Sequence, residues 1–402
     1  MNSAQTQFTP QAIGRKVLWR LALPTILFLL LSSLDRVNIS FAALQMNSDL
    51  KLTHSQYGFG AGILFLGFLA GQFPSVILLQ RLGMHRWMAG CSILLGCCAA
   101  GIAFVHTPLQ FYTLRILLGI AEGGLAPGIV VYLSQFATER ERATTFAIPM
   151  LAIPLSVVIG SPISGYLMSM RTPWGLAGWQ WMLIAEALPA ILLGILAWLY
   201  FPDRLHDVRW LSDDERQWLE RNAANRVRSD NRNEWRILRQ PIVLASALIW
   251  FCLLSGAYGI MFWLPLMIKQ LSSVTPIQIG LINALPWAGA MLGMYYNSRH
   301  SDRTGERFYH IGVPAQGAFW ALPTSALNAN TFAVAAVAIN IAGTSSGLIV
   351  PNLVGYVREQ SGSFLGPTLL IALIVSLAAL LVAYIRRFLF DRESKLDLTP
   401  VL

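Results

Sequence analysis

Long apolar blocks alternate with shorter polar segments along the chain. A bilayer core about 30 Å thick requires about 20 apolar residues per helix, and ten blocks approach or exceed that length. They lie near residues 21–44, 57–80, 87–105, 111–136, 144–168, 180–201, 241–268, 277–297, 331–356 and 364–385. The pattern predicts an all-α polytopic membrane protein. The first block is too long for a signal-peptide core and lacks a cleavage pattern, so we expect an uncleaved first span.

Composition supports this class, since 55% of the 402 residues are hydrophobic and only 12% are charged. The net charge of +9 could indicate a nucleic-acid partner, so the placement of the 29 basic residues matters. Twenty-three lie in the two terminal segments and in alternate loops, whereas the remaining loops hold four. This asymmetry follows the positive-inside rule and predicts cytoplasmic N- and C-termini with no nucleic-acid partner.

Signals for other kinds of chemistry are missing from the sequence. The four cysteines have neither metal-ligand nor disulfide-framework spacing, which favours plain packing roles. Neither a nucleophile–base set nor a phosphate-binding loop is recognisable. We therefore expect no cofactor, no metal site and no enzymatic activity.

A charged segment at 203–240 divides the chain into two halves, predicted as a six-helix bundle at 1–202 and a C-terminal bundle at 241–402. Within this linker, "LSDDERQWLERNAANRV" is typical of an amphipathic helix capped by Ser212. A solvated connector is the favoured interpretation, with a regulatory or lipid-binding role as the alternative.

The two halves differ in length, although their first two helices match. Residues 21–81 of the first half correspond in length to 241–299 of the second, but 86–202 has a much shorter counterpart in 307–386. The second half is short by about 37 residues, more than one span. We expect helices nine and ten to be reduced to a stub, with the truncation around 308–328.

The uncharged stretch "IGVPAQGAFWALPTS" lies at this deficit. A single crossing there would place the C-terminal basic residues outside, against the positive-inside bias. The sequence therefore predicts a re-entrant stub over 311–328 that enters from the cytoplasm and returns to it.

Ionisable residues inside spans are costly, by at least about 2.5–3.5 kcal/mol at the bilayer centre, and are functional candidates. The first span contains Asp35 and Arg36 in "SSLDRVNIS", and the fourth contains Arg115 and Glu122 in "RILLGIAEGGLAPG". Arg115 and Glu122 share one helix face about 10 Å apart along the axis. Structural ion pairs between helices are the alternative interpretation.

These residue types suit an anion carried together with a proton. Guanidinium groups bind carboxylates through a bidentate fork. A carboxylate in a low-dielectric cavity can load and release a proton, because desolvation favours its neutral form and a nearby arginine opposes this.

The chain resembles the anion:cation symporter family within the major facilitator superfamily. The resemblance rests on "DRVNISFA", "RILLGIAEGGLAPG", "GWQWMLIAEALPAILLG", "SRHSDRTGER" and "FWALP" and extends over nearly the whole chain. It is strongest to 4-hydroxyphenylacetate permease and to tartrate-, rhamnonate- and phthalate-type carriers. It implies two six-helix bundles that rock about a midplane site. One departure is the loop "LLQRLGMHRW", which lacks the superfamily's aspartate.

The resemblance also implies roles for individual residues. Proton coupling falls to Asp35 and Glu122, and substrate binding to Arg36, Arg115, Trp320 and Asn340. The cytoplasmic gate loop would contain Asp302, Arg303 and Arg307.

The sequence thus predicts a proton-coupled symporter of a small organic anion, an aromatic or hydroxy monocarboxylate, in a bacterial inner membrane. A sugar-acid or tartrate-like symporter is one alternative, and a transport-defective relic or sensor that binds without accumulating is another. The expected partners are the anion, protons and lipid. A monomer is favoured, with a dimer as the alternative.

Overall fold

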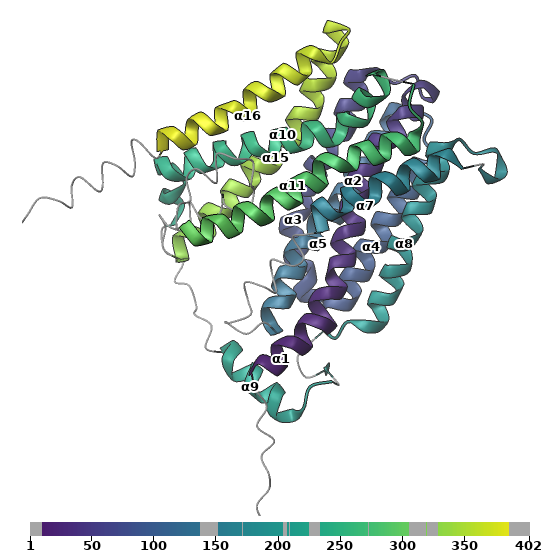
Figure 1. Ribbon diagram of the computed structural model, residues 1–402. Helices are drawn as coiled ribbons and strands as arrows, with labels where there is room; N and C mark the ends of the chain where they lie inside the picture. The colour runs from purple at the N-terminus through teal and green to yellow at the C-terminus, as the bar shows by residue number, and fades with distance from the viewer. Residues whose placement is uncertain are drawn as a thin grey trace, which may run out of the picture. The chain divides into compact units, whose positions relative to one another are not determined.

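The computed structural model describes residues 10–136, 152–170, 172–203, 207–208, 210–224, 234–271, 273–304, 319 and 329–385. All regular structure in these ranges is helical (Figure 1). The predicted stub at 311–328 lies outside the described residues, apart from Phe319, and its re-entrant path stays a prediction. Trp320 and Arg307 also lie outside them.

Each of the ten predicted spans corresponds to a helix in the described ranges. In chain order these are α2 (Leu23–Asp49), α3 (His54–Leu82), α4 (Met84–Ile102), α5 (Pro108–Phe136), α7 (Ala152–Ser169), α8 (Gly178–Tyr200), α10 (Pro241–Leu271), α11 (Pro276–Thr304), α15 (Ala329–Ser361) and α16 (Leu365–Ile385). The first part of the span predicted at 144–168 is not described. Six described helices are long and apolar enough to cross a membrane by length and composition.

In the described ranges, two shorter α-helices lie on polar segments. They are α1 (Pro10–Val17) before the first span and α9 (Asp213–Ala224) in the linker. The amide of Ser212 donates to the Glu215 carboxylate at 3.0 Å, and the Glu215 amide donates back to Ser212 Oγ at 3.3 Å. This reciprocal pair satisfies amides that the first helical turn leaves unpaired. The predicted Ser212 cap is therefore confirmed.

The chain divides into two compact units by contacts. One contains Met1–Asn38 and Gly67–Arg228, and the other contains Ile39–Leu66 and Ser229–Leu402. The end of α2 and the first half of α3 thus group with helices of the second half. Their shared unit is held by contacts such as the Tyr57 hydroxyl donating to the Phe262 carbonyl at 2.9 Å.

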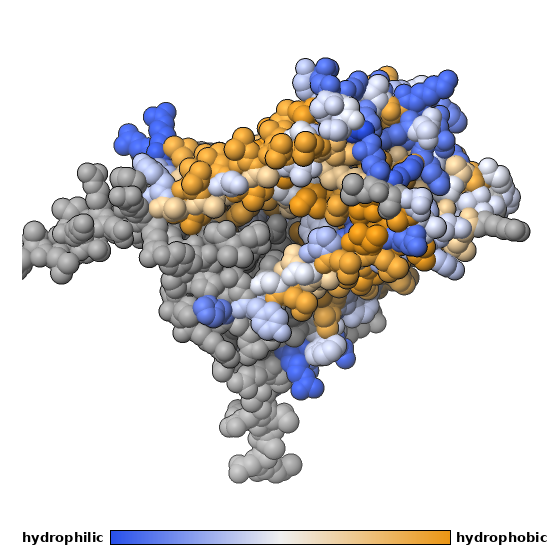
Figure 2. All heavy atoms as spheres, turned by 45° about the horizontal axis from the view of Figure 1, so that its top comes forward, coloured by the Kyte–Doolittle hydropathy of each residue, from blue (hydrophilic) through white to orange (hydrophobic). Residues whose placement is uncertain are grey.

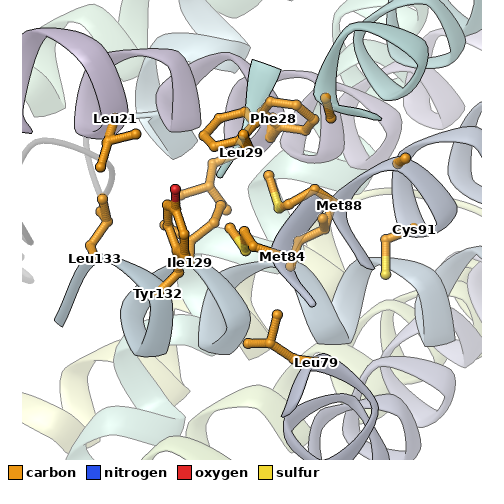
Figure 3. Close-up of a cluster of buried hydrophobic side chains, with 14 of the residues drawn as sticks. Leu21, Phe28, Leu29, Leu79, Met84, Met88, Cys91, Ile129, Tyr132 and Leu133 are labelled. Carbon is orange, nitrogen blue, oxygen red and sulfur yellow. The ribbon is translucent and has the colours of Figure 1, made fainter. Parts of the chain in front are cut away.

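The core of the first unit joins α1, α2, α4, α5 and the linker helix. Figure 3 shows Phe28 and Leu29 beside Met84 and Met88, with Ile129 nearby. All five side chains are buried. The helix α4 also packs extensively along α8, which lies beside it in Figure 1. This packing fixes the helices that carry the ionisable side chains.

The core of the second unit is formed by α10, α15 and α16. Trp250 on α10 stacks on Phe319, with ring centroids 4.6 Å apart and planes 18° apart. The outer face of α16 carries exposed large apolar residues, including Leu365, Leu369, Leu373 and Leu380. Figure 2 shows broad hydrophobic areas with hydrophilic residues gathered at their ends. Such a surface suits contact with lipid acyl chains.

Candidate functional site

The ionisable site begins with a close approach of α3 and α5. Side chains added at Gly67 or Gly71 on α3 would overlap the backbone of Ile116 and Ile120 on α5. Only glycine permits two helices to approach this closely. The contact fixes α5, and with it Arg115 and Glu122, within the unit that holds the first part of α2.

Arg36 on α2 pairs with Glu122 on α5. The distance from Arg36 Nε to Glu122 Oε1 is 2.7 Å, and the side chains are 11% and 1% exposed. Ser32 Oγ donates to the same carboxylate oxygen at 2.9 Å. The guanidinium also lies over the Phe68 ring, 5.0 Å from its centroid, an arrangement that favours a cation.

Asp35 lies beside this pair and is held by its own helix and by α5. Asn38 Nδ2 donates to Asp35 Oδ1 at 3.0 Å. The fully buried Arg115 reaches the backbone carbonyl of Asp35, with 3.4 Å between Nη1 and the oxygen. Arg115 also interacts electrostatically with the carboxylates of Asp35 and Glu122. The structure therefore brings together all four predicted charged residues of these two helices.

The charges of this cluster balance when all four groups are ionised. Two guanidinium groups then face two carboxylates in a buried environment, where an uncompensated charge is expensive. One oxygen of Asp35 and one of Glu122 are buried without a hydrogen bond of normal geometry to any described residue. An added anion would upset this balance unless a proton entered with it.

Glu186 on α8 is a third buried carboxylate, and it is absent from the residues singled out by sequence. Ser164 Oγ on α7 donates to Glu186 Oε1 at 2.7 Å. The side chain interacts with Asn38 and, through its charge, with Asp35. The cost of an ionisable group in a span applies equally to the acid in "MLIAEALPA", so that rule could have found it.

The second unit contains the remaining described candidate for substrate contact. Asn340 lies half-buried on α15, one residue after the buried Ile339. Asp302 and Arg303 belong to the last turn of α11, but their side chains are outside the description. With Trp320 and Arg307, they keep their sequence-based roles as predictions.

The loop between α3 and α4 lacks the superfamily's aspartate, but an aspartate from elsewhere in the chain contacts it. Asp203, which follows α8, accepts a hydrogen bond from the His85 backbone amide at 3.1 Å and lies 2.8 Å from its ring Nδ1. Gly83 directly precedes α4 with φ of 84°, and a side chain there would meet the Asp203 carboxylate. Asp203 thus caps the α4 N-terminus from outside the loop.

In the described part of the chain, no three His, Cys, Asp or Glu side chains are placed to hold a metal ion together. All four cysteines are described and free, with Cys97 exposed and the other three buried.

The chain belongs to the Major Facilitator Superfamily, whose family model matches residues 25–383. It is thus a multi-pass membrane transporter by family, with the all-α fold of that superfamily. The fold also resembles the crystal structure of a D-xylose–proton symporter, with a TM-score of 0.71 at 15% identity, covering 92% of this chain and 98% of that one.

Two proteins of Agrobacterium vitis named for tartrate transport are relatives along most of their length. One is 37% identical, covering 93% of this chain and 91% of the relative, and the other is 36% identical, covering 93% and 94%. These similarities agree with an organic-anion branch of the superfamily.

Both alignments extend over 409 positions. Since 93% of 402 residues is about 374, about 35 aligned positions in each relative have no counterpart in this chain. This is close in size to the shortening that the loop spacing predicts.

Proposed function

We propose that the chain is a proton-coupled symporter of a small organic anion in a bacterial inner membrane. The observation that carries the proposal is the buried ion pair between Arg36 and Glu122, with 2.7 Å between Nε and Oε1. An arginine that could bind a substrate carboxylate is already occupied by a carboxylate of the protein. The substrate and Glu122 therefore compete for the same cation.

Protonation of Glu122 resolves this competition. The neutral acid no longer attracts the guanidinium strongly, so Arg36 can direct its fork to a substrate carboxylate. The buried cluster keeps its charge balance when each substrate carboxylate that enters takes the place of one negative charge removed by a proton, so that a dicarboxylate needs protons on both Glu122 and Asp35. Release of the proton restores the internal pair and expels the anion. Each species thus favours binding of the other, which is the thermodynamic requirement for symport.

A hydroxylated dicarboxylate is the substrate class that we favour, with tartrate as the first probe. The names of the two Agrobacterium relatives support tartrate. Two buried arginines, Arg36 and Arg115, also suit two carboxylates. The aromatic or hydroxy monocarboxylate expected from the sequence is the alternative and is tested with benzoate and lactate.

The test is uptake into proteoliposomes that contain the purified full-length protein. We expect tartrate to accumulate against its gradient when the outside is made acidic, and accumulation to stop when a protonophore is added. Empty liposomes are the control. Accumulation of benzoate but not tartrate would establish the aromatic alternative. Saturable tartrate binding without accumulation would contradict symport and support a relic or sensor.

The proposal also places both termini in the cytoplasm, following the distribution of basic residues. A single cysteine at position 394, Ser394→Cys, tests this in a background whose four native cysteines are replaced, because Cys97 is exposed. We expect an impermeant thiol reagent to label this cysteine only after the membrane is opened. Labelling in intact cells would place the C-terminus outside.

A further inference from the structure

We propose that Glu186 is a third proton-binding carboxylate of the transport cycle, electrostatically coupled to Asp35 on either side of the Asn38 amide. This inference rests on the proposed proton-coupled function. It adds a carboxylate on α8 to the pair on α2 and α5.

Glu186 is buried without a counter-ion among its described contacts. The residue is 5% exposed, and it accepts a hydrogen bond from the neutral hydroxyl of Ser164. The other oxygen, Oε2, is buried and has no partner of normal hydrogen-bond geometry in the described part of the chain. A buried carboxylate with one unsatisfied oxygen is costly when ionised. A bound proton removes that cost.

Contacts of α7 with α2 and with α8 bring Glu186 close to the cluster of Asp35, Arg36, Arg115 and Glu122. On α7, Gly160 lies against the end of the Leu34 side chain of α2, so these two helices are in contact. Ser164 lies one turn further along α7 and contacts Glu186 on α8. Glu186 therefore lies in the same buried interior as Asp35, although α8 contains neither the motif of α2 nor the motif of α5.

Asn38 lies between the two carboxylates. Its Nδ2 donates to Asp35 Oδ1 at 3.0 Å, and its side chain also interacts with Glu186, outside normal hydrogen-bond geometry. An amide nitrogen carries two protons and can donate to two acceptors. Because Asp35 and Glu186 repel each other when both are ionised, a proton on either one makes ionisation of the other easier.

The groups that face Glu186 come from each neighbouring helix. The helix α2 contributes Asp35 and Asn38, and α7 contributes Ser164, its one ionisable side chain being Tyr166. On α4, the ionisable side chains within Met84–Ile102 are His85 and Arg86 in the first turn and three cysteines. His85 pairs with Asp203 beyond the far end of α8. Of these charged groups, Asp35 is the one that interacts with Glu186, and the charge of Glu186 disfavours ionisation of Asp35.

Infrared spectroscopy of the purified full-length protein tests the proposal without any substrate. A protonated carboxyl group has a C=O stretch that disappears when the group ionises. We expect Glu186→Gln to remove one titrating carboxyl band from the pH difference spectrum. We also expect Glu186→Gln to move the midpoint of the Asp35 carboxyl band to lower pH, because the repelling charge of Glu186 is lost. Asp35→Asn identifies that band by removing it. A Glu186→Gln spectrum with every wild-type titrating band would overturn the proposal.

Ser164→Ala is the matched control because it removes the hydrogen bond but keeps the acid. The Glu186 band should persist in this variant at a changed frequency, which assigns it even if Glu186→Gln folds poorly. A band that does not respond to Ser164→Ala is not Glu186. An unchanged midpoint of the Asp35 band in Glu186→Gln would overturn the coupling between the two carboxylates.

Transport supplies the second measurement. In proteoliposomes with an imposed pH gradient, we expect accumulation of tartrate by Glu186→Gln to fall toward the level seen without a gradient. Full accumulation by this variant would overturn its role in the cycle. Failure of the wild-type protein to accumulate any of the tested anions would overturn the proposed function alone, because the infrared titration still reports on Glu186.

Discussion

Arg36 and Glu122 form a buried ion pair that joins α2 to α5, with 2.7 Å between Nε and Oε1. The pair connects the two segments in which the sequence concentrates ionisable residues. Because one partner can be neutralised by a proton and the other attracts anions, the bond between the helices depends on what is bound. An ion pair of this kind can link occupancy to helix position in a transporter.

Replacing Glu122 by glutamine should free Arg36 at every pH. We expect Glu122→Gln to bind tartrate about tenfold more tightly than the wild type at alkaline pH, a difference of about 1.4 kcal/mol. Its affinity should vary less with pH than that of the wild type, since the charge that competes for Arg36 is gone while Asp35 and Glu186 still titrate. Calorimetric titration of tartrate across a pH series measures this. Retention of the wild-type pH profile would show that Glu122 does not compete with the anion.

Arg115→Lys keeps the charge of a fully buried side chain but loses the planar fork. We expect tartrate affinity to fall by at least about tenfold, since a hydrogen bond to a charged group contributes about 1.5–3 kcal/mol. Arg358→Lys on α15 is the matched control, because Arg358 is also buried, 8% exposed, and lies over Phe364 instead. If Arg115→Lys binds tartrate like the wild type, Arg115 does not contact the substrate carboxylate.

The linker helix should be tied to the N-terminal helix by Lys16 and Glu215. Burial raises the pKa of Glu215, but hydrogen bonds from Lys16 and Ser212 outweigh burial and hold the pKa below its ordinary value. Lys16 Nζ lies 2.7 Å from Glu215 Oε1. A depressed pKa contributes stability above the unfolded pKa, and this stability is lost as the pH falls through the folded pKa.

We therefore expect Glu215→Gln to destabilise α9 at neutral pH by about 1 kcal/mol, with little difference from the wild type in acid. Hydrogen exchange of the α9 amides, corrected for the intrinsic rate at each pH, measures this. Glu359→Gln, outside the linker, serves as the control. An effect of Glu215→Gln that persists undiminished in acid would indicate lost packing and not lost charge.

The turn before α4 should tolerate only glycine at position 83. The backbone has φ of 84°, and an added side chain would meet the Asp203 carboxylate. We expect Gly83→Ala to cost at least about 1–2 kcal/mol from the left-handed backbone alone. Thermal unfolding in detergent measures the loss. Adding Asp203→Ala to Gly83→Ala should not restore the wild-type stability, because the strain remains and the α4 cap is removed. A Gly83→Ala protein as stable as the wild type would refute this account.

The sequence by itself determined the positions of the ten long helices in the described ranges. Apolar length is a local property, and each block forms a helix because the bilayer leaves backbone groups no other partner. The Ser212 cap was equally local, since its partner lies three residues away. The sequence also marked Asp35, Arg36, Arg115 and Glu122 as candidates, because a charge inside a span is costly wherever it is placed.

Only the tertiary structure decided which of these groups meet. Arg115 and Glu122 share a helix, yet Glu122 forms its ion pair with Arg36 of α2. Glu186 joined the cluster through α7 and α8, and Asp203 capped a helix whose first turn lies 118 residues earlier. Such partners depend on how closely helices pack, which is set by glycine contacts between distant segments such as Gly67 and Ile116. Helical periodicity predicts the face of a helix on which a residue lies, but packing across the whole unit decides which helix lies against that face.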